Sequence, residues 1–306
     1  MENSQLEKIG LGTWAFGGRA YGPMADEVAL SVANRAYHLG IRFYDTAHIY
    51  ASGRSEELLG EVFGSEKNVN ICTKIGYDIS TGKPVKRFDD NFLDKSLSIS
   101  LQRLKRKPID LLMLHNPPTN VLENSSIYKW LNSQIERGHI LRWGVSVYDS
   151  VRDAELALDA GAKAIEARYS LIRRDIIDEL SASKWQFDFI ARSPLDGGLL
   201  TGKYIGGETF PKTDQRSAKD LSYIRTNREF LAELQSLVDD GIVQSFAELA
   251  IRFVAFAPAV SIVIPGAKSI EQLEQNINAV NQGPLPSNAV TLINNLREKY
   301  LSLLCE

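Results

Sequence analysis

Eight short, β-prone apolar runs alternate with amphipathic segments of helical period along this 306-residue chain. Strands that alternate with helices favour a parallel sheet, and eight of them favour closure into a (β/α)8 barrel over an open doubly wound sheet. No glycine-, serine- or proline-rich linker interrupts the alternation, so we expect residues 1–306 to form a single (β/α)8 TIM-barrel domain. The expected strands cover residues 8–13, 41–47, 69–74, 109–115, 141–147, 164–170, 187–193 and 261–265, and the expected helices 26–39, 55–63, 90–105, 122–137, 150–160, 175–184, 244–256 and 269–280.

Two stretches fall outside this repeat. Residues 196–227 form a long, polar, glycine-containing excursion after the seventh strand, and loops of this length are either functional lids or disordered. Residues 288–304 have the amphipathic pattern of an extra C-terminal helix that packs on the barrel.

Composition excludes several classes of protein. The net charge of −3 gives no electrostatic reason to expect nucleic acid or an anionic membrane as a partner. The two cysteines, Cys72 and Cys305, make neither a disulfide framework nor a metal site. The amino terminus lacks the pattern of a signal peptide, and no apolar run is long enough to span a bilayer. We therefore expect a cytoplasmic protein without a metal; its oligomeric state is not readable from the sequence.

Reactive side chains follow three consecutive apolar runs. Asp45 and Tyr50 come after the second expected strand, Lys74 ends the third and His115 ends the fourth. The carboxyl ends of barrel strands build the active face in this architecture. Each residue alone could be a packing, capping or solvated side chain, but their joint occurrence indicates one catalytic site.

These four residue types suit the reduction of a carbonyl group. The alkoxide formed by hydride transfer needs a proton, which Tyr50 can donate, although a phenol with a pKa near 10 is poorly matched to neutral pH. We expect the Lys74 ammonium to lower that pKa, Asp45 to keep Lys74 charged and in place, and His115 to orient the carbonyl oxygen. Lys74 could alternatively be a Schiff-base nucleophile.

Seven motifs spread over nearly the whole chain are GLGTW (10–14), DTA…Y…SEELLG (45–60), TK (73–74), DLLMLHNP (110–117), RWGVSVY (142–148), SPLDGGLLTGKY (193–204) and IPGAKSIEQLEQN (264–276). On these motifs the chain resembles the aldo-keto reductase superfamily. That resemblance implies a (β/α)8 barrel which interconverts aldehydes or ketones with alcohols, uses NAD(P)H and has tyrosine as general acid/base.

The resemblance also implies a cofactor site. Ser146 matches the serine that holds the nicotinamide carboxamide, Lys268 is placed to meet a 2′-phosphate, and Asn276 matches an adenine-contacting asparagine. We therefore favour NADPH over NADH, although Gln272 stands where many relatives carry arginine and Lys268 could instead be solvated. The excursion either folds over the pyrophosphate or is a disordered surface loop. The expected cofactor residues are Thr13, Trp14, Asp45, Ser146, Glu166, Arg192, Ser193, Leu195, Gly197, Gly198, Lys203, Gly266, Lys268, Gln272 and Asn276.

The sequence departs from the family pattern beneath the expected nicotinamide. Val147 replaces an asparagine, Glu166 a glutamine, and Arg192 an aromatic residue that often stacks on the ring. We hypothesise that Glu166 and Arg192 form an ion pair, with the guanidinium plane as the stacking surface; the alternative is two independent, solvated charges. The family's amino-terminal hairpin has little room before Lys8, and we expect it to be shortened or absent.

The substrate is expected to be a small or medium aldehyde, ketone or sugar. Its pocket would be lined by Trp14, Tyr50, Tyr77, His115 and Asn116. Two alternatives to a reductase remain: a cofactor-sensing regulatory subunit of the same fold, and an aldolase that uses Lys74.

Overall fold

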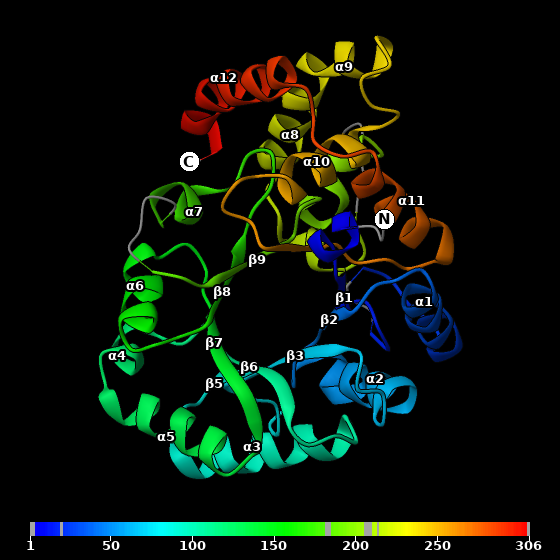
Figure 1. The fold of residues 1–306 in the computed structure, drawn as a ribbon. Coiled ribbons are helices and arrows are strands. Elements are labelled where there is room, and N and C mark those ends of the chain that lie inside the picture. Colours follow the sequence, from blue (N-terminus) through cyan, green and yellow to red (C-terminus); the bar gives the residue numbers. More distant parts are fainter. Residues whose placement is uncertain (1–3, 19–20, 181–184, 205–209, 213, 305–306) are drawn as a thin grey trace.

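Parallel strands form a closed barrel at the centre of the molecule (Figure 1). The structure is a computed structural model that describes residues 4–18, 21–180, 185–204, 210–212 and 214–304. One sheet has the strand order β1-β2-β3-β6-β7-β8-β9-β10, and the parallel bridges Ile9–Val263 and Gly12–Gly266 join its first strand to its last. All eight expected strands are present: β1 Leu11–Gly12, β2 Phe43–Asp45, β3 Asn70–Ile75, β6 Ile109–His115, β7 Ile140–Ser146, β8 Ala164–Arg168, β9 Asp188–Arg192 and β10 Ile262–Ile264.

Helices surround the barrel and cover its outer apolar face (Figure 1). The expected helices are confirmed over most of their lengths, and the C-terminal α12 packs beside α8. Within the described residues, no helix combines the length and apolarity needed to cross a membrane. The helices are α1 Asp26–His38, α2 Arg54–Phe63, α3 Asp90–Arg103, α4 Thr119–Leu122, α5 Ser125–Glu136, α6 Val151–Asp159, α7 Asp175–Leu180, α8 Leu221–Glu233, α9 Gln235–Asp239, α10 Phe246–Ala255, α11 Ile270–Asn281 and α12 Ser287–Leu304.

Three features differ from the sequence-based expectation. The 196–227 excursion is not wholly a loop, because it contains the 3-10 helices η3 (Asp196–Thr201) and η4 (Gln215–Ala218) and the start of α8. A two-stranded hairpin, β4 (Tyr77–Asp78) and β5 (Val85–Lys86), was not expected. The 3-10 helix η1 (Ser4–Lys8) lies directly before the barrel, where an amino-terminal hairpin was expected to be shortened or absent. Residues 181–184 of the sixth expected helix, 175–184, lie outside the described residues.

The barrel interior consists of an apolar layer with a polar layer above it. Since side chains alternate between the two faces of a strand, residues two positions apart point the same way. The apolar layer contains Phe43, Cys72, Met113, Ala164 and Ile190. Two positions further along the same strands stand Asp45, Lys74, His115, Glu166 and Arg192. The alternation therefore directs all five polar side chains into the mouth at the carboxyl ends of the strands.

Closure of the barrel depends on glycine at position 12. A Cβ atom there would lie 2.8 Å from the Ile264 carbonyl oxygen, whereas a Cβ at Gly266 would meet nothing nearer than the Gly12 carbonyl oxygen at 3.5 Å. We predict that Gly12→Ala lowers the free energy of unfolding by about 1–3 kcal/mol, because the two edge strands must separate. Gly266→Ala, the matched control, should change it by less than about 0.5 kcal/mol. Urea denaturation of both variants checks this, and equal midpoints would contradict it.

Candidate active site

Lys74 is the centre of the polar layer, and its side chain is wholly buried. Its Nζ atom donates hydrogen bonds to Asp45 Oδ1 at 2.5 Å, to the Thr46 carbonyl oxygen at 3.0 Å and to Tyr50 Oη at 3.3 Å. These three bonds use all three hydrogens of the ammonium group. The structure thus brings together three of the four residues expected to be catalytic.

The electrostatics of this cluster differ in one respect from the expectation. Burial opposes the charge on Lys74, but the carboxylates of Asp45 and Glu166 outweigh it and hold the pKa of Lys74 well above its usual value. Burial also raises the pKa of Tyr50 above that of a free phenol, and the Lys74 ammonium only partly offsets this effect. Lys74 thus acts on the pKa of Tyr50 in the expected direction, but burial outweighs it, so the net pKa lies above that of a free phenol.

Glu166 is a second carboxylate on the same lysine. Its Oε2 atom lies 3.2 Å from Lys74 Nζ, and its Oε1 atom accepts a hydrogen bond from Ser146 Oγ at 3.2 Å. The Arg192 Nε atom lies 3.7 Å from Glu166 Oε1, while Arg192 Nη2 donates to the Val147 carbonyl oxygen at 3.2 Å. The hypothesised Glu166–Arg192 ion pair is thus formed, but Glu166 also contacts Lys74, which the sequence did not indicate.

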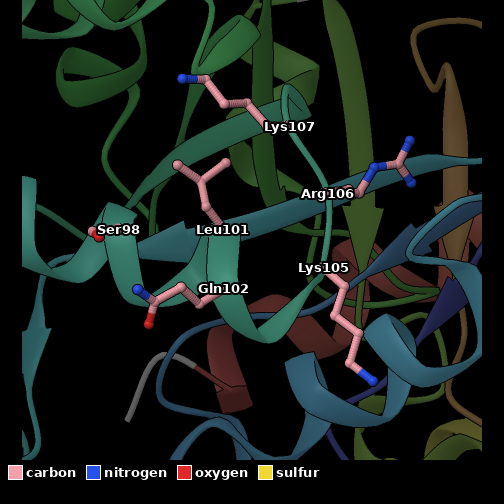
Figure 2. A pocket seen from close by; sticks show the side chains of 6 residues that line it. All are labelled: Ser98, Leu101, Gln102, Lys105, Arg106 and Lys107. Atoms are coloured by element: carbon pink, nitrogen blue, oxygen red, sulfur yellow. The ribbon is translucent and has the colours of Figure 1, made fainter.

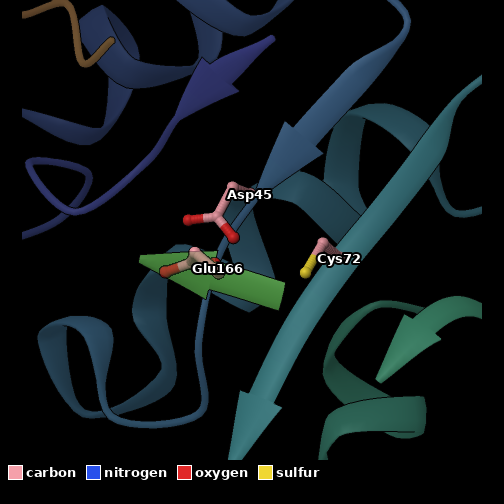
Figure 3. A group of neighbouring side chains, drawn as sticks. All are labelled: Asp45, Cys72 and Glu166. Atoms are coloured by element: carbon pink, nitrogen blue, oxygen red, sulfur yellow. The ribbon is translucent and has the colours of Figure 1, made fainter. Parts of the chain in front are cut away.

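Three potential metal ligands meet inside the barrel (Figure 3). One ligand atom from each of Asp45, Cys72 and Glu166 lies within 4.8 Å of the others. Burial raises the pKa of the Cys72 thiol well above its usual value, so the sulfur keeps its proton. Both carboxylates are already within ion-pair distance of Lys74 Nζ, which supplies the positive charge at this place.

His115 and its neighbours form the wall of the mouth. His115 Nδ1 and Asn116 Oδ1 are buried polar atoms without a hydrogen-bond partner. Burial, followed by the charges of Lys74 and Arg192, holds the pKa of His115 well below its usual value, so the imidazole is neutral. Tyr50 and Tyr77 approach the imidazole edge-on, and the half-exposed Trp14 stacks on Tyr50 at 5.2 Å between ring centroids. All five residues expected to line the substrate pocket therefore lie around this mouth.

A strained turn carries Tyr50. In the 3-10 helix η2 (Tyr50–Gly53), Ala51, Ser52 and Gly53 all have positive φ angles, of 47°, 56° and 98°. Such angles disfavour residues other than glycine, so the turn needs external support. Arg103 supplies it, because its Nη2 atom donates to the Ser52 carbonyl oxygen at 3.2 Å.

Arg103 is itself held by a buried polar network. Its Nη1 atom lies 3.3 Å from Glu56 Oε2 and 3.3 Å from His48 Nδ1, and Glu56 is wholly buried. Thr73 Oγ1 donates to the other Glu56 oxygen at 2.6 Å. Burial, followed by the Arg103 charge, lowers the pKa of His48 to about 4. The sequence reasoning missed this network, although a glutamate among the apolar positions of α2 was a signal for it.

The turn after β9, where a pyrophosphate clasp was predicted, has a left-handed backbone at four positions. Ser193, Asp196, Gly197 and Gly198 all have positive φ angles, between 44° and 91°, in a segment that also contains Leu195. Arg216, from the excursion, donates to the Gly197 carbonyl oxygen at 3.4 Å and lies over the rings of Tyr204 and Phe210. The described part of the excursion therefore packs against this turn, whereas the predicted cofactor residue Lys203 is exposed.

The remaining predicted cofactor residues lie at the closing edge of the barrel and already have partners. Lys268 Nζ donates to the Tyr21 carbonyl oxygen at 2.6 Å, and Asn276 Nδ2 donates to the Gly266 carbonyl oxygen at 3.2 Å. Gln272 Oε1 accepts from the Lys268 backbone amide at 2.9 Å. Thr13 was also predicted to bind cofactor, but its hydroxyl does not face the mouth, because it is buried between the Asp45 carbonyl oxygen and Ser55 Oγ.

A separate pocket of about 380 Å³ opens near the amino end of β6, away from this mouth (Figure 2). Its three basic side chains, Lys105, Arg106 and Lys107, point in different directions and do not converge on one point. We assign it no part in the site.

The chain belongs to the aldo/keto reductase family, whose model matches residues 8–298. Members of this family are oxidoreductases that use a nicotinamide cofactor and act on small carbonyl compounds. Among curated relatives, an uncharacterised oxidoreductase from Mycobacterium bovis is 33% identical over 288 residues, which cover 90% of this chain and 85% of that protein. Aldo-keto reductase YhdN from Bacillus subtilis is 27% identical over 308 residues, with coverages of 97% and 92%.

Solved structures agree with the fold. A glycerol dehydrogenase from Gluconobacter oxydans aligns with a TM-score of 0.80 and 25% identity, over 96% of this chain and 92% of that one. The holo form of an aldo-keto reductase from Bacillus halodurans aligns with a TM-score of 0.75 and 22% identity, over 94% and 91%.

The support that Arg103 gives to the Tyr50 turn can be measured. We predict that Arg103→Met lowers the free energy of unfolding by about 2–3 kcal/mol, because it leaves the buried Glu56 carboxylate without its cation. Arg35 pairs with Glu274 on the surface, so Arg35→Met is the matched control and should cost less than about 1 kcal/mol. Thermal or urea unfolding decides between them, and a cost for Arg103→Met no greater than that of the control would contradict the assigned role.

Proposed function

We propose that this protein catalyses the NADPH-dependent reduction of an aldehyde, ketone or sugar carbonyl to an alcohol, and the reverse reaction. One observation carries the proposal: a buried ammonium, Lys74, contacts both a phenol, Tyr50, and a carboxylate, Asp45. This is the arrangement needed to deliver a proton to a developing alkoxide at the mouth of the barrel.

Tyr50 acts as the proton donor in this proposal. The phenol carries its proton at neutral pH, and the Lys74 ammonium works against the burial that raises its pKa, which favours transfer of the proton to the alkoxide oxygen. The phenolate that remains is stabilised by the Lys74 ammonium, 3.3 Å away. Asp45 fixes the position of Lys74, and the neutral imidazole of His115 orients the carbonyl oxygen through a hydrogen bond.

The polar atoms at the mouth fit a nicotinamide cofactor, which supplies the hydride when it is bound. His115 Nδ1 and Asn116 Oδ1 are buried without a hydrogen-bond partner, as expected of a site shaped for a polar ligand. Ser146 and Glu166 would hold the carboxamide, and Arg192 would lie beneath the ring. The residues that would hold the rest of the dinucleotide are Trp14, Ser193, Leu195, Gly197, Gly198, Lys203, Gly266, Lys268, Gln272 and Asn276.

The substrate would enter between Trp14, Tyr77, His115 and Asn116, with its carbonyl oxygen at Tyr50. Aromatic walls with one amide suit a small or medium carbonyl compound. The structural neighbour named glycerol dehydrogenase supports a small, hydroxylated member of this class.

The aldolase alternative is disfavoured by the environment of Lys74. A Schiff-base lysine must be a neutral amine with a depressed pKa, whereas the carboxylates around Lys74 hold its pKa well above the usual value. Borohydride treatment with substrate should therefore trap no covalent adduct.

The cofactor-sensing alternative would require that the site bind cofactor without turnover, so the following experiment separates it from a reductase.

Tyr50→Phe should abolish most turnover while leaving the cofactor site intact. We predict a fall in kcat of about 10²–10⁴-fold, because general acid catalysis is lost, and a cofactor Kd changed by less than about twofold. Tyr44→Phe is the control, since this tyrosine is on the same strand as Asp45 but faces the Ala33 and Ile41 carbonyl oxygens. NADPH consumption is measured over a panel of aldehydes and ketones. Undiminished turnover in Tyr50→Phe would rule out the assigned donor.

Lys268 should determine the preference for NADPH. Replacement by methionine removes the charge offered to a 2′-phosphate, so we predict about a 10- to 100-fold rise in the Kd of NADPH and little change for NADH. Fluorescence titration with both cofactors measures this. Tighter binding of NADH than NADPH by the unaltered protein would refute the preference.

A further inference from the structure

The contact between Glu166 and Lys74 crosses the barrel. Lys74 is the penultimate residue of β3, and Glu166 lies on β8, which pairs with β7 and β9 and not with β3. Asp45 and Glu166 therefore reach the same ammonium from two strands that are not paired with each other, a carboxyl oxygen of each lies within 4.8 Å of the other, and both side chains are almost completely buried. Figure 3 shows them side by side.

Two buried carboxylates and one ammonium leave an acceptor without a donor. Lys74 Nζ already donates to Asp45, to the Thr46 carbonyl oxygen and to Tyr50, so no ammonium hydrogen remains for Glu166. Glu166 Oε2 accordingly has no hydrogen bond, although it lies only 3.2 Å from Nζ. A proton on one of the two carboxyl groups removes the repulsion between them and supplies the missing donor.

We propose that Asp45 and Glu166 share one proton, and that this carboxyl pair sets the charge beneath the nicotinamide. Glu166 is in this view a positioning and charge-setting residue that acts through Lys74 and Asp45. The statement about the cofactor rests on the proposed function, whereas the shared proton does not.

The surroundings of the pair agree with this assignment. Burial and the charge of Glu166 raise the pKa of Asp45 to about 8, although Lys74 lowers it. Arg192, 3.7 Å from Glu166, adds a second positive charge on the side that would face the ring. The titratable and charged groups that face the pair are Lys74 and Cys72 from β3, Tyr50 from η2, Arg192 from β9 and, across the mouth, His115 from β6.

The pair makes cofactor preference depend on pH. In this proposal the pair holds one proton and carries one negative charge at neutral pH, because burial and the Glu166 charge raise the pKa of Asp45 to about 8. Above about pH 8 the proton is lost and the site becomes more negative by one unit. Since oxidised nicotinamide is a cation and the reduced ring is neutral, loss of the proton favours the oxidised cofactor.

The shared proton can be observed in the protein without cofactor. Infrared spectra of the unaltered chain at neutral pH should contain the C=O band of a protonated carboxyl group that disappears as the pH rises through about 8. The band should be missing from Glu166→Gln and from Asp45→Asn, so the spectrum of the unaltered chain minus that of either variant, recorded at the same pH, should contain it. The other buried glutamate, Glu56, is present in every sample and cancels. A spectrum identical in the unaltered chain and both variants would overturn the proposal.

Cofactor binding tests the consequence. We predict that the ratio of the Kd of oxidised to that of reduced cofactor falls about tenfold between pH 6.5 and 9.5, and that it stays within twofold in Glu166→Gln. The 2′-phosphate is common to both forms and cancels in the ratio. Asp188→Asn is the control, because it removes a carboxylate at the opposite end of β9 and should keep the pH dependence.

The outcomes separate the two proposals. A protonated carboxyl band with no measurable binding of either cofactor would contradict the proposed function and leave the shared proton standing. Binding of both cofactors with a ratio that does not depend on pH, or that changes equally in Glu166→Gln, would contradict the charge-setting role of Glu166.

Discussion

The structure depends on one buried positive charge. Removal of an ammonium group from water costs several kcal/mol unless its charge and its hydrogen bonds are satisfied. Lys74 meets this requirement with Asp45, the Thr46 carbonyl oxygen, Tyr50 and Glu166, which come from three separate segments of the chain. The ammonium therefore holds β2, β3, β8 and the Tyr50 turn in one arrangement, and the same contacts give it its proposed catalytic use.

The barrel supplies the geometry for that charge. Five of the eight strands place an apolar side chain in the apolar layer and a polar one two residues later, so closure of the sheet brings the polar groups together. In-register pairing aligns His115, Ser146 and Glu166 across three adjacent strands. The apolar layer keeps water away from one side of the polar layer, which strengthens the electrostatic contacts within that polar layer. The other predicted site residues, including Tyr50 and those of the turn after β9, come from loops. Residues with left-handed backbone at Ala51–Gly53 and within Ser193–Gly198 fix the path of the chain there.

Much of this could be predicted from sequence because it depends on local pattern. The hydrophobic period of the sequence and the order of its segments predict the eight strands and the position of Asp45, Lys74 and His115 near strand ends. They also predict the pairing of Glu166 with Arg192 on neighbouring strands. The Glu166–Lys74 contact could not, since it depends on the diameter of the closed barrel. The net rise in the pKa of Tyr50 was missed for a related reason: the degree of burial is a property of the whole packed mouth. The helix α8 and the β4–β5 hairpin were missed because polar, glycine-containing segments give a weak periodic signal.

A crystal structure of the protein with a bound dinucleotide would test the central claim most directly, namely that Lys74 couples Tyr50 to two carboxyl groups beneath a nicotinamide ring. Our account predicts a ring that rests over Arg192 with its carboxamide at Ser146 and Glu166, and a Tyr50 hydroxyl still within hydrogen-bond distance of Lys74 Nζ. A dinucleotide bound elsewhere, or a Tyr50 hydroxyl separated from Lys74 in the complex, would contradict it.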